Sequence, residues 1–382
     1  VGFNKEVVIA DSSWKTQNKI INKTETVGVN KPLQLKFSFR TPVKKGKYTA
    51  KFNLLTDGEE VNGAVLEIPV TVIKDASSNY EVPILIADTT KRKLVEESNI
   101  KVGLFQANKP VRVKSVFPYK IYSGESERGL LPNNSVATLD YKNGVYYFIS
   151  PTKEFKSNEH IRLVPFDNKS YFKILDYDRK VSYKGNTNFD TYRGIMEFKY
   201  SPRKKFPYVV NELPLDQYVA GIGETIDVAP IEYIKAVLTA ARSYAYNSIN
   251  SGVPKDQRTF DVYGSTVDQL YLGYNSELIG KNIVKAAQST FGEMITYKTK
   301  PVTAPYFGNS DGKTRSWSTV WGGADKSWLK PVICYYDKGR SMFGHGVGMS
   351  MRDASRRASN DNWDYQKILK YYYTGIKVEK IY

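Results

Sequence analysis

The N-terminal half of the chain alternates between hydrophobic and polar positions in short runs, a period of two that is typical of half-buried strands. Three such runs fall within residues 1–77, and Asp-Gly and Asn-Gly dipeptides between the last two mark turns. Their lengths and spacing predict a small β-sandwich of the immunoglobulin type, without a polar cluster that would suggest catalysis. The strands are expected at Pro32–Phe39, Tyr48–Leu54 and Ala64–Val72.

Residues 78–205 continue the strand pattern and contain no periodic segment of helical length. We therefore expect a β-rich scaffold that supports the region after it. His160 has no second histidine or cysteine at ligand spacing, so we expect it at the surface. The clearest strand candidates are Ile100–Phe105, Arg112–Phe117, Val145–Ile149, Ile161–Val164 and Gly194–Tyr200.

Residues 206–382 change to a period close to 3.6, which predicts helices among further strands and hence an α+β core. The strongest helix follows Pro230, where apolar residues recur at i, i+3 and i+4 through Ala245. A second helix is predicted over Ser276–Thr290, with Ser276 as its N-cap. The remaining helices are expected at Arg352–Ala358 and Trp363–Tyr373, and strands at Gly292–Tyr297, Val302–Phe307 and Ile376–Tyr382.

One glutamate, Glu224, lies in the turn-rich segment Gly221–Pro230 directly before the strongest helix. Pro230 suits the first helical position, and Asp227 is a candidate cap for the same helix. The segment around Glu224 contains Ile222, Gly223 and Ile226, an apolar setting that would raise a carboxyl pKa into the range of a general acid. By itself the pattern also fits a loop glutamate that binds a backbone amide or faces solvent.

A second stretch, Phe343–Ser350, has three glycines at alternate positions around His345. Glycines at this spacing let another backbone or an extended ligand approach closely. The stretch has no strand-helix setting with the spacing of a dinucleotide loop. Trp317, Trp321 and Trp328 would either stack on sugar rings or pack into a core.

Lys and Arg number 56 against 39 Asp and Glu, a net charge of +17 that favours an anionic partner. The charge is spread along the chain without a basic helix, which argues against nucleic acid. Cys334 is the single cysteine, so the sequence excludes an intrachain disulfide and a closed Cys/His zinc site. No apolar stretch is long enough to cross a membrane. Because the chain begins at Val1, we expect a signal or anchor segment before it.

From about Ile100 onwards, five segments in order resemble the SpoIID/LytB family of bacterial cell-wall proteins. The last of them, GHGVGMS, is the most recognisable signature of that family. The five segments are VVNELPLDQYVAGIGE (Val209–Glu224), IEYIKAVLTAARSYA (Ile231–Ala245), DQLYLGY (Asp268–Tyr274), APYFGNSDGKTRSWSTVWGG (Ala304–Gly323) and GHGVGMS (Gly344–Ser350).

The resemblance implies an exported, wall-associated lytic transglycosylase that cuts the MurNAc–GlcNAc bond of peptidoglycan glycan strands and leaves 1,6-anhydro ends. It identifies Glu224 as the general acid and base, and it implies no cofactor and no metal. Arg242 is either a clamp on a substrate carboxylate or a structural ion pair. The substrate-binding residues that the resemblance suggests are Arg242, Tyr244, Gln269, Tyr271, Ser310, His345, Gly346 and Ser350.

The sequence departs from the family pattern after the glutamate, where Thr225 and Ile226 replace Met-Pro, and after the GHGVGMS segment, where Met351 replaces glutamine. These departures keep open an alternative function, a non-enzymatic amidase enhancer or wall-binding protein, whose partner would be a wall amidase. Both readings place the protein outside the cell or in its envelope.

Overall fold

The computed structural model describes residues 35, 37, 39, 41–56, 59–76, 94–251 and 259–382. The chain divides into two compact units, residues 1–93 and residues 94–382, and each is described by itself. The domain boundaries predicted after residues 77 and 205 stay predictions.

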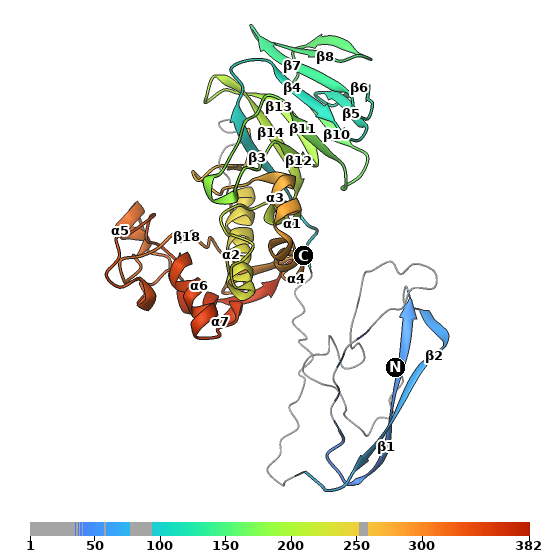
Figure 1. Cartoon of the computed structure of the whole chain (residues 1–382), viewed down its shortest axis with the longest axis vertical. Helices are drawn as coiled ribbons and strands as arrows, with labels where there is room; N and C mark the ends of the chain where they lie inside the picture. The colour runs from blue at the N-terminus through green and yellow to red at the C-terminus, as the bar shows by residue number, and fades with distance from the viewer. Residues whose placement is uncertain are drawn as a thin grey trace. The chain divides into compact units, whose positions relative to one another are not determined.

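In the first unit, β1 (Gly46–Thr56) and β2 (Glu59–Val72) pair antiparallel, with Gly46 opposite Val72 (Figure 1). Phe52 of β1 is buried. The two strands contain the runs predicted at Tyr48–Leu54 and Ala64–Val72. The third predicted strand, Pro32–Phe39, lies mostly outside the described residues, so the immunoglobulin-like sandwich is not confirmed.

The second unit begins with two sheets, and several of their strands alternate buried side chains with half-buried or exposed ones. The first strands are β3 (Asn99–Gln106), β4 (Val111–Ser115), β5 (Tyr119–Ser123), β6 (Ser126–Leu131), β7 (Val136–Lys142) and β8 (Val145–Ile149). The others are β9 (Glu154–Ser157), β10 (Ile161–Pro165), β11 (Tyr171–Ile174), β12 (Thr191–Arg193), β13 (Ile195–Ser201), β14 (Phe206–Pro214) and β15 (Val262–Tyr263).

One sheet has the order β15-β3-β14-β13-β10-β5-β6 and the other the order β12-β11-β4-β7-β8-β9. Rings from the two sheets meet between them: Tyr119 of β5 lies 6.2 Å from Phe172 of β11, and Tyr146 of β8 lies 6.2 Å from Phe198 of β13. The sheets therefore share one apolar core, as strands with a two-residue period require. All five β segments predicted in this region coincide with strands of the structure.

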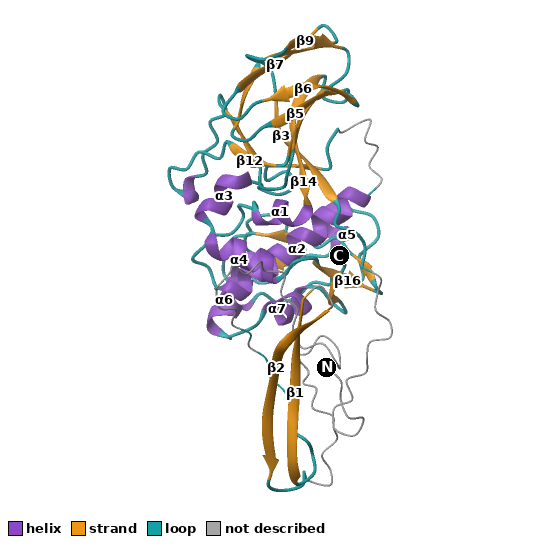
Figure 2. Ribbon diagram, turned by 90° about the vertical axis from the view of Figure 1, so that its right-hand side faces the viewer, coloured by secondary structure: helices purple, strands orange, loops and turns teal. Residues whose placement is uncertain are grey.

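Seven helices, counted over the described residues, gather at one end of this unit (Figure 2). They are α1 (Leu215–Ala220), α2 (Ile231–Asn250), α3 (Gly273–Ile279), α4 (Lys281–Ser289), α5 (Trp317–Trp321), α6 (Met351–Asn360) and α7 (Tyr365–Tyr372). Among them run the strands β16 (Glu293–Tyr297), β17 (Lys300–Pro301), β18 (Tyr306–Phe307), β19 (Met349–Ser350) and β20 (Lys377–Lys380). The mixed α+β class predicted from the sequence is confirmed.

Helix α2 is the centre of the helical part and is in contact with α4, α6, α7 and β16. Its residues from Tyr233 to Ser243 are buried almost without interruption, apart from Lys235. The i, i+3, i+4 pattern of its apolar residues predicted one buried face, and the structure buries this part of the helix on all sides. None of the helices in the described ranges has both the length and the apolar character needed to cross a membrane.

The helix predicted over Ser276–Thr290 is instead two helices, α3 and α4, broken at Gly280. Gly280 has φ −105° and ψ 68°, and a Cβ there would lie 2.8 Å from the carbonyl oxygen of Ser276. Ser276 is buried inside α3, so its prediction as an N-cap is wrong.

The predicted cap of α2 is also wrong. Asp227 Oδ1 accepts hydrogen bonds from the backbone N–H groups of Asn282 (2.7 Å) and Ile283 (3.0 Å), so Asp227 caps α4. The local sequence could not show this, because the helix it caps begins more than 50 residues later.

His160 is not a free surface histidine. Its Nε2 lies 3.4 Å from a carboxylate oxygen of Glu197, a buried residue of β13. Lys101 and Arg162 bind the same carboxylate from β3 and β10. The histidine therefore belongs to a cluster of charged groups on one sheet.

Candidate active site

Glu224 lies in the loop between α1 and α2, and this loop is pressed against the segment 270–272. The Gly223 N–H donates to the Leu270 carbonyl (2.7 Å), and the Leu272 N–H donates to the Gly221 carbonyl (2.8 Å). A Cβ on Gly223 would lie 2.3 Å from Leu272 Cδ1, and a Cβ on Gly221 would lie 2.5 Å from Tyr271 Cε2. The two glycines before the glutamate are thus required by close packing.

Both oxygens of the Glu224 carboxyl group are held by its own chain. Oε1 accepts a hydrogen bond from the backbone N–H of Leu270 at 3.1 Å, and Oε2 accepts one from the hydroxyl of Tyr306. The glutamate is partly buried, and it forms no ion pair with any residue in the described part of the chain. The carboxyl is therefore fixed by neutral donors.

Burial raises the pKa of Glu224 to about 7, although the hydrogen bonds from Tyr306 and Leu270 act in the opposite direction. Removing a carboxylate from water disfavours its charged form, and no nearby cation compensates strongly enough. A carboxyl group with this pKa can give up or take a proton near neutral pH, as a general acid and base must.

A line of hydrogen bonds continues from Glu224 into the interior. The Gln269 side-chain amide donates to the Tyr306 hydroxyl (2.9 Å), and the Tyr218 hydroxyl donates to Gln269 Oε1 (2.9 Å). Gln269 was predicted as a site residue, and the structure brings it to Glu224 through Tyr306. Tyr306 itself was not predicted, although it lies in the third position of the Ala304–Gly323 segment that resembles the family.

The glycine-rich segment around His345 packs against the strand that carries Tyr306. Strand β18 pairs parallel with β19, with Tyr306 opposite Met349. A Cβ on Gly348 would lie 2.0 Å from the carbonyl oxygen of Pro305, so only glycine fits beside this strand. Gly346 is buried, and its carbonyl accepts a hydrogen bond from the Arg315 N–H at 2.7 Å.

His345 lies beside the backbone of Tyr306. Its Nδ1 accepts a hydrogen bond from the Val347 N–H at 3.1 Å, and its ring centre is 5.5 Å from that of Phe307 and 4.9 Å from that of Trp321. Burial lowers its pKa, while the backbone of Tyr306 raises it in part. The histidine is therefore biased toward the neutral form at neutral pH.

The two predicted serines share one partner. The hydroxyls of Ser310 and Ser350 both donate to Asp337 Oδ2, at 3.0 and 2.5 Å, and all three residues are buried. Arg352 binds the other oxygen of Asp337 at 3.1 Å. These contacts join the two glycine-rich segments to each other, and they do not include Glu224.

The other predicted residues are engaged within the fold. Arg242 is buried and binds Asp216 through Nε at 3.0 Å and Nη2 at 2.5 Å, so its structural ion pair is present. Tyr244 donates to Asp268 (2.8 Å), and Tyr271, which is buried, donates to Asn211 (2.9 Å). Their roles as substrate contacts stay predictions.

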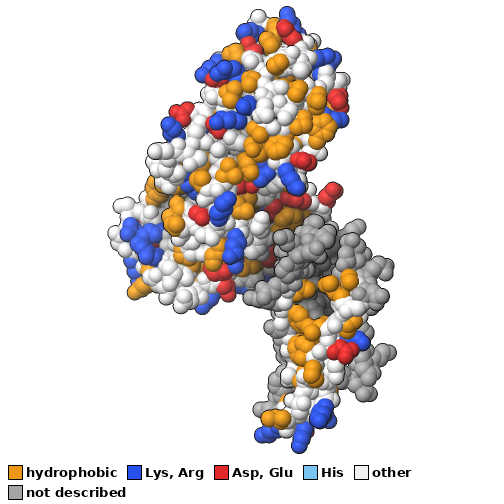
Figure 3. Space-filling model, turned by 45° about the vertical axis from the view of Figure 1, so that its right-hand side comes forward, with side chains coloured by type: hydrophobic (Ala, Val, Ile, Leu, Met, Phe, Trp, Pro, Cys, Tyr) orange, Lys and Arg blue, Asp and Glu red, His pale blue; other side chains and the backbone are white. Residues whose placement is uncertain are grey.

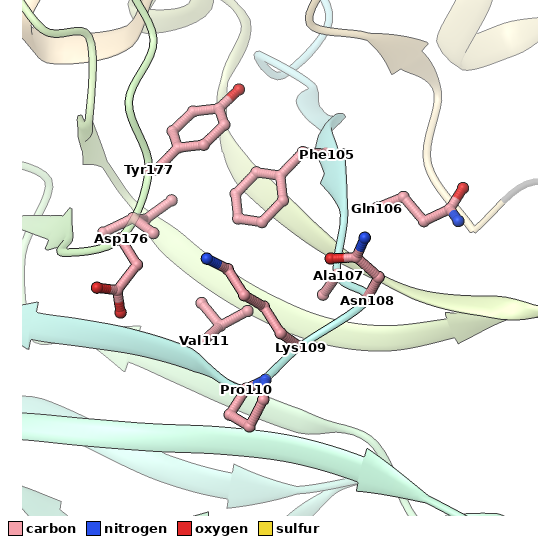
Figure 4. Close-up of a pocket in the computed structure, with 10 residues that line it drawn as sticks. Phe105, Gln106, Ala107, Asn108, Lys109, Pro110, Val111, Asp176 and Tyr177 are labelled. Atoms are coloured by element: carbon pink, nitrogen blue, oxygen red, sulfur yellow. The ribbon is translucent and has the colours of Figure 1, made fainter.

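A pocket of about 120 Å³ lies near the turn between β3 and β4, away from these residues. Figure 4 shows the amino group of Lys109 among Phe105, Tyr177 and Asp176. The rings of Phe105 and Tyr177 are stacked with centres 4.3 Å apart. Glu224, Tyr306 and Gln269 are not part of its lining, so we assign it no role in the chemistry of Glu224. Within the described ranges, no group of three or more His, Cys, Asp or Glu side chains is placed to hold a metal ion.

Comparison with known proteins finds a similarity that includes the Glu224 loop and α2. Residues 204–297 match the sequence model of the SpoIID family, which is described as stage II sporulation protein. The chain is 33% identical over 143 residues to stage II sporulation protein D of Bacillus subtilis (strain 168), which is 34% of this chain and 41% of the relative. It is 30% identical over 144 residues to the protein of the same name from Bacillus amyloliquefaciens, with the same coverage. The chain thus spans about two-fifths of the length of these relatives.

Proposed function

We propose that this chain, whose residues 204–297 match the SpoIID family, is a lytic transglycosylase that cuts the glycan strands of peptidoglycan. The observation that carries the proposal is the raised pKa and the fixed orientation of the Glu224 carboxyl group. Its pKa is raised to about 7, and its two oxygens are oriented by Leu270 and Tyr306. A protonated carboxyl in a fixed position is what cleavage of a glycosidic bond requires of an acid.

The reaction needs one carboxyl group. Glu224 donates its proton to the glycosidic oxygen between MurNAc and GlcNAc, and the bond from C1 of MurNAc to that oxygen breaks. The C6 hydroxyl of the same MurNAc forms a new bond to C1 and returns its proton to Glu224. The products are a 1,6-anhydro-MurNAc end and a free 4-hydroxyl on GlcNAc, so no water is consumed.

A glycosidase that hydrolyses its substrate would use a second carboxylate near the first. Asp227 is the nearest candidate in the sequence, but its side chain accepts two backbone hydrogen bonds at the start of α4. An aspartate with this structural role is a poor base for activating water. The single-carboxylate mechanism is therefore the better match for the residues around Glu224.

We further propose that the protein acts in the cell wall during sporulation and is located in the cell envelope or outside the cell. The names of its relatives support the first part. The net charge of +17 suits an anionic wall, and Figure 3 shows the Lys and Arg side chains spread over the visible face of residues 94–382. A charge distributed in this way favours retention near polyanions without a specific binding patch.

The test is digestion of purified glycan strands, with and without stem peptides, by the wild-type chain and by Glu224→Gln. Mass spectrometry identifies the new ends. We expect 1,6-anhydro-MurNAc ends from the wild type and none from the variant. Reducing ends would show hydrolysis instead, and products from both proteins would remove Glu224 from the mechanism.

One observation favours the second candidate, a non-enzymatic enhancer of a wall amidase. In the loop that departs from the family pattern, Val228 is 87% exposed and Ile226 is 43% exposed. A contiguous exposed apolar patch marks a surface that binds another protein, and these two side chains would form part of such a patch. If neither glycan is cut, and the wild-type chain increases the activity of an added wall amidase while Val228→Asp does not, this candidate replaces the first.

A further inference from the structure

The short helix η1 (Ser182–Lys184) lies at the tip of a loop whose two ends are tied together. The Phe189 N–H donates to the Arg179 carbonyl (2.9 Å), and the Arg179 N–H donates to the side chain of Asn188 (2.7 Å). The Arg179 guanidinium also binds the carbonyl of Gly264, in the segment that leads to Gln269. The position of the tip is therefore set by the fold.

Two consecutive side chains of η1 hold the backbone on either side of Glu224. The Tyr183 hydroxyl donates to the carbonyl of Gly223 at 3.1 Å, and the Lys184 ammonium donates to the carbonyl of Thr225. Two residues 40 and 41 positions earlier in the chain thus bind the peptide unit directly before the glutamate and the second peptide unit after it. Within the described part of the chain, Lys184 forms no ion pair.

The ring of Tyr183 remains largely open although its hydroxyl is fixed. The residue is 53% exposed, and the Lys184 ammonium lies 5.9 Å from the ring centre. The hydrogen bond to Gly223 places the Tyr183 hydroxyl beside the residue that directly precedes Glu224. Burial, and after it the charge of Glu224, raises the pKa of this hydroxyl. An exposed aromatic ring held rigidly beside a carboxyl group is the usual platform for a sugar ring, because its flat face covers the C–H groups of a pyranose.

We propose that Tyr183 is a sugar-binding residue of the Glu224 site, on whose ring a pyranose of the glycan strand stacks next to the bond that is cut. The inference rests on the proposed function, since it names a residue that positions the same substrate. It also assigns part of the site to the β-rich region, because Tyr183 precedes residues 204–297 that match the family. The site is then complete only when both regions are present.

The experiment measures the binding of a peptide-free glycan oligosaccharide by calorimetry to the full chain carrying Glu224→Gln, which prevents cleavage. Tyr183→Phe and Tyr183→Ala are added to this background. Tyr335→Ala is the matched control, because Tyr335 is 63% exposed and has Lys338 5.2 Å from its ring centre. Among the described residues, its side chain forms no hydrogen bond with the Glu224 loop. The melting temperature of each variant shows that it is folded.

We expect Tyr183→Ala to weaken binding about tenfold, because the stacked face is lost, while Tyr183→Phe and Tyr335→Ala bind like the parent. If Tyr183→Ala also binds like the parent, this inference is overturned and the proposed function stands. If Tyr183→Phe weakens binding as much as Tyr183→Ala, the hydroxyl contact to Gly223 is what matters, and stacking is excluded. If the parent does not bind glycan at all, the proposed function fails and the inference fails with it.

Discussion

The hydroxyl of Tyr306 donates a hydrogen bond to Oε2 of Glu224, although 82 positions separate the two residues in the chain. Tyr306 is the first residue of β18, which pairs with the end of the glycine-rich segment around His345. The contact therefore connects three separate segments of the sequence at one carboxyl group. Loss of this contact should change the pKa of Glu224 and the rate of cleavage, and both can be measured.

Tyr306→Phe removes the donor to Glu224 while keeping the ring. We expect the cleavage rate to fall by roughly 100-fold, because the carboxyl loses the group that orients it. Since the Tyr306 hydrogen bond lowers the pKa of Glu224, its loss should also raise that pKa further. The measurement is kcat/KM against pH for glycan cleavage.

Tyr365→Phe is the control for this change, because the Tyr365 hydroxyl also donates to a glutamate, Glu293, at 2.8 Å. It should leave the pH profile as it is in the wild type. A Tyr306→Phe profile that falls in rate without moving along the pH axis would contradict a direct contact between the two groups in solution.

The pH dependence of the wild-type chain follows from the raised pKa of Glu224. The protonated form is the acid that starts the reaction, so activity should be present below pH 7 and decline as the pH rises through about 7. A free glutamate would lose its proton about 2.5 pH units lower. A profile of kcat/KM from pH 4 to 9 that already declines near pH 4.5 would show that the carboxyl is hydrated in solution.

Gly348→Ala should disrupt the pairing of β18 with β19. The new Cβ would lie 2.0 Å from the Pro305 carbonyl oxygen, and Gly348 has φ +80°. We expect a loss of stability of about 2 kcal/mol or more and a loss of cleavage, because Tyr306 follows Pro305 directly. Urea unfolding and the digestion assay measure the two effects.

Gly339→Ala is the control that separates the effect of the close contact with Pro305 from the effect of the positive φ angle. Gly339 has a similar φ of +77°, but a Cβ there would meet no atom within 4 Å. Backbone strain in this variant should lower the free energy of unfolding by only about 1 kcal/mol, and activity should be unchanged. Equal losses in the two variants would mean that the close contact with Pro305 is relieved without consequence.

Asp227→Ala tests whether this carboxylate is structural or catalytic. Loss of the cap on α4 should lower the free energy of unfolding by about 1 kcal/mol and leave the cleavage products unchanged. Asp227→Asn retains the acceptor oxygen and should recover most of the stability. Loss of cleavage in both folded variants would instead make Asp227 a second catalytic carboxylate.

The buried carboxylate of Glu197 should make the free energy of unfolding depend on pH in the acid range. Burial by itself would raise its pKa, but His160 and Lys101 more than offset this and lower it to about 2. Because the folded pKa lies below the unfolded one, the stabilisation is complete above about pH 4.5 and is lost as the pH falls toward 2. Glu197→Gln should therefore destabilise the protein at pH 7, on the order of 3 kcal/mol, and much less near pH 2.

Glu127→Gln is the comparison for this variant. Glu127 binds Lys120 at 3.1 Å, but both side chains are exposed. Its loss should change the stability at pH 7 much less than Glu197→Gln does, because water screens an exposed ion pair. A similar loss in both variants would contradict the special role of the buried cluster around Glu197.

The sequence by itself determined most elements of residues 94–382 and the position of the candidate acid. The two-residue period marked the strands of the β-rich region, the 3.6-residue period marked α2, and the setting of Glu224 anticipated its raised pKa. These properties depend on residues close together in the chain, so their patterns are visible without coordinates. The prediction of one long helix after Ser276 was wrong, because a periodic pattern read over many residues does not show a break at a single residue, Gly280.

Only the tertiary structure decided which side chains meet. Tyr306 and Tyr183 reach the Glu224 loop from 82 and 40 positions away, and Asp227 caps a helix that the sequence did not connect with it. It also assigned Ser310 and Ser350 to Asp337, and Arg242 to Asp216. A hydrogen bond between distant residues requires only a compatible donor and acceptor. Many pairs in one sequence satisfy that condition, and the packing of the sheets and helices selects among them.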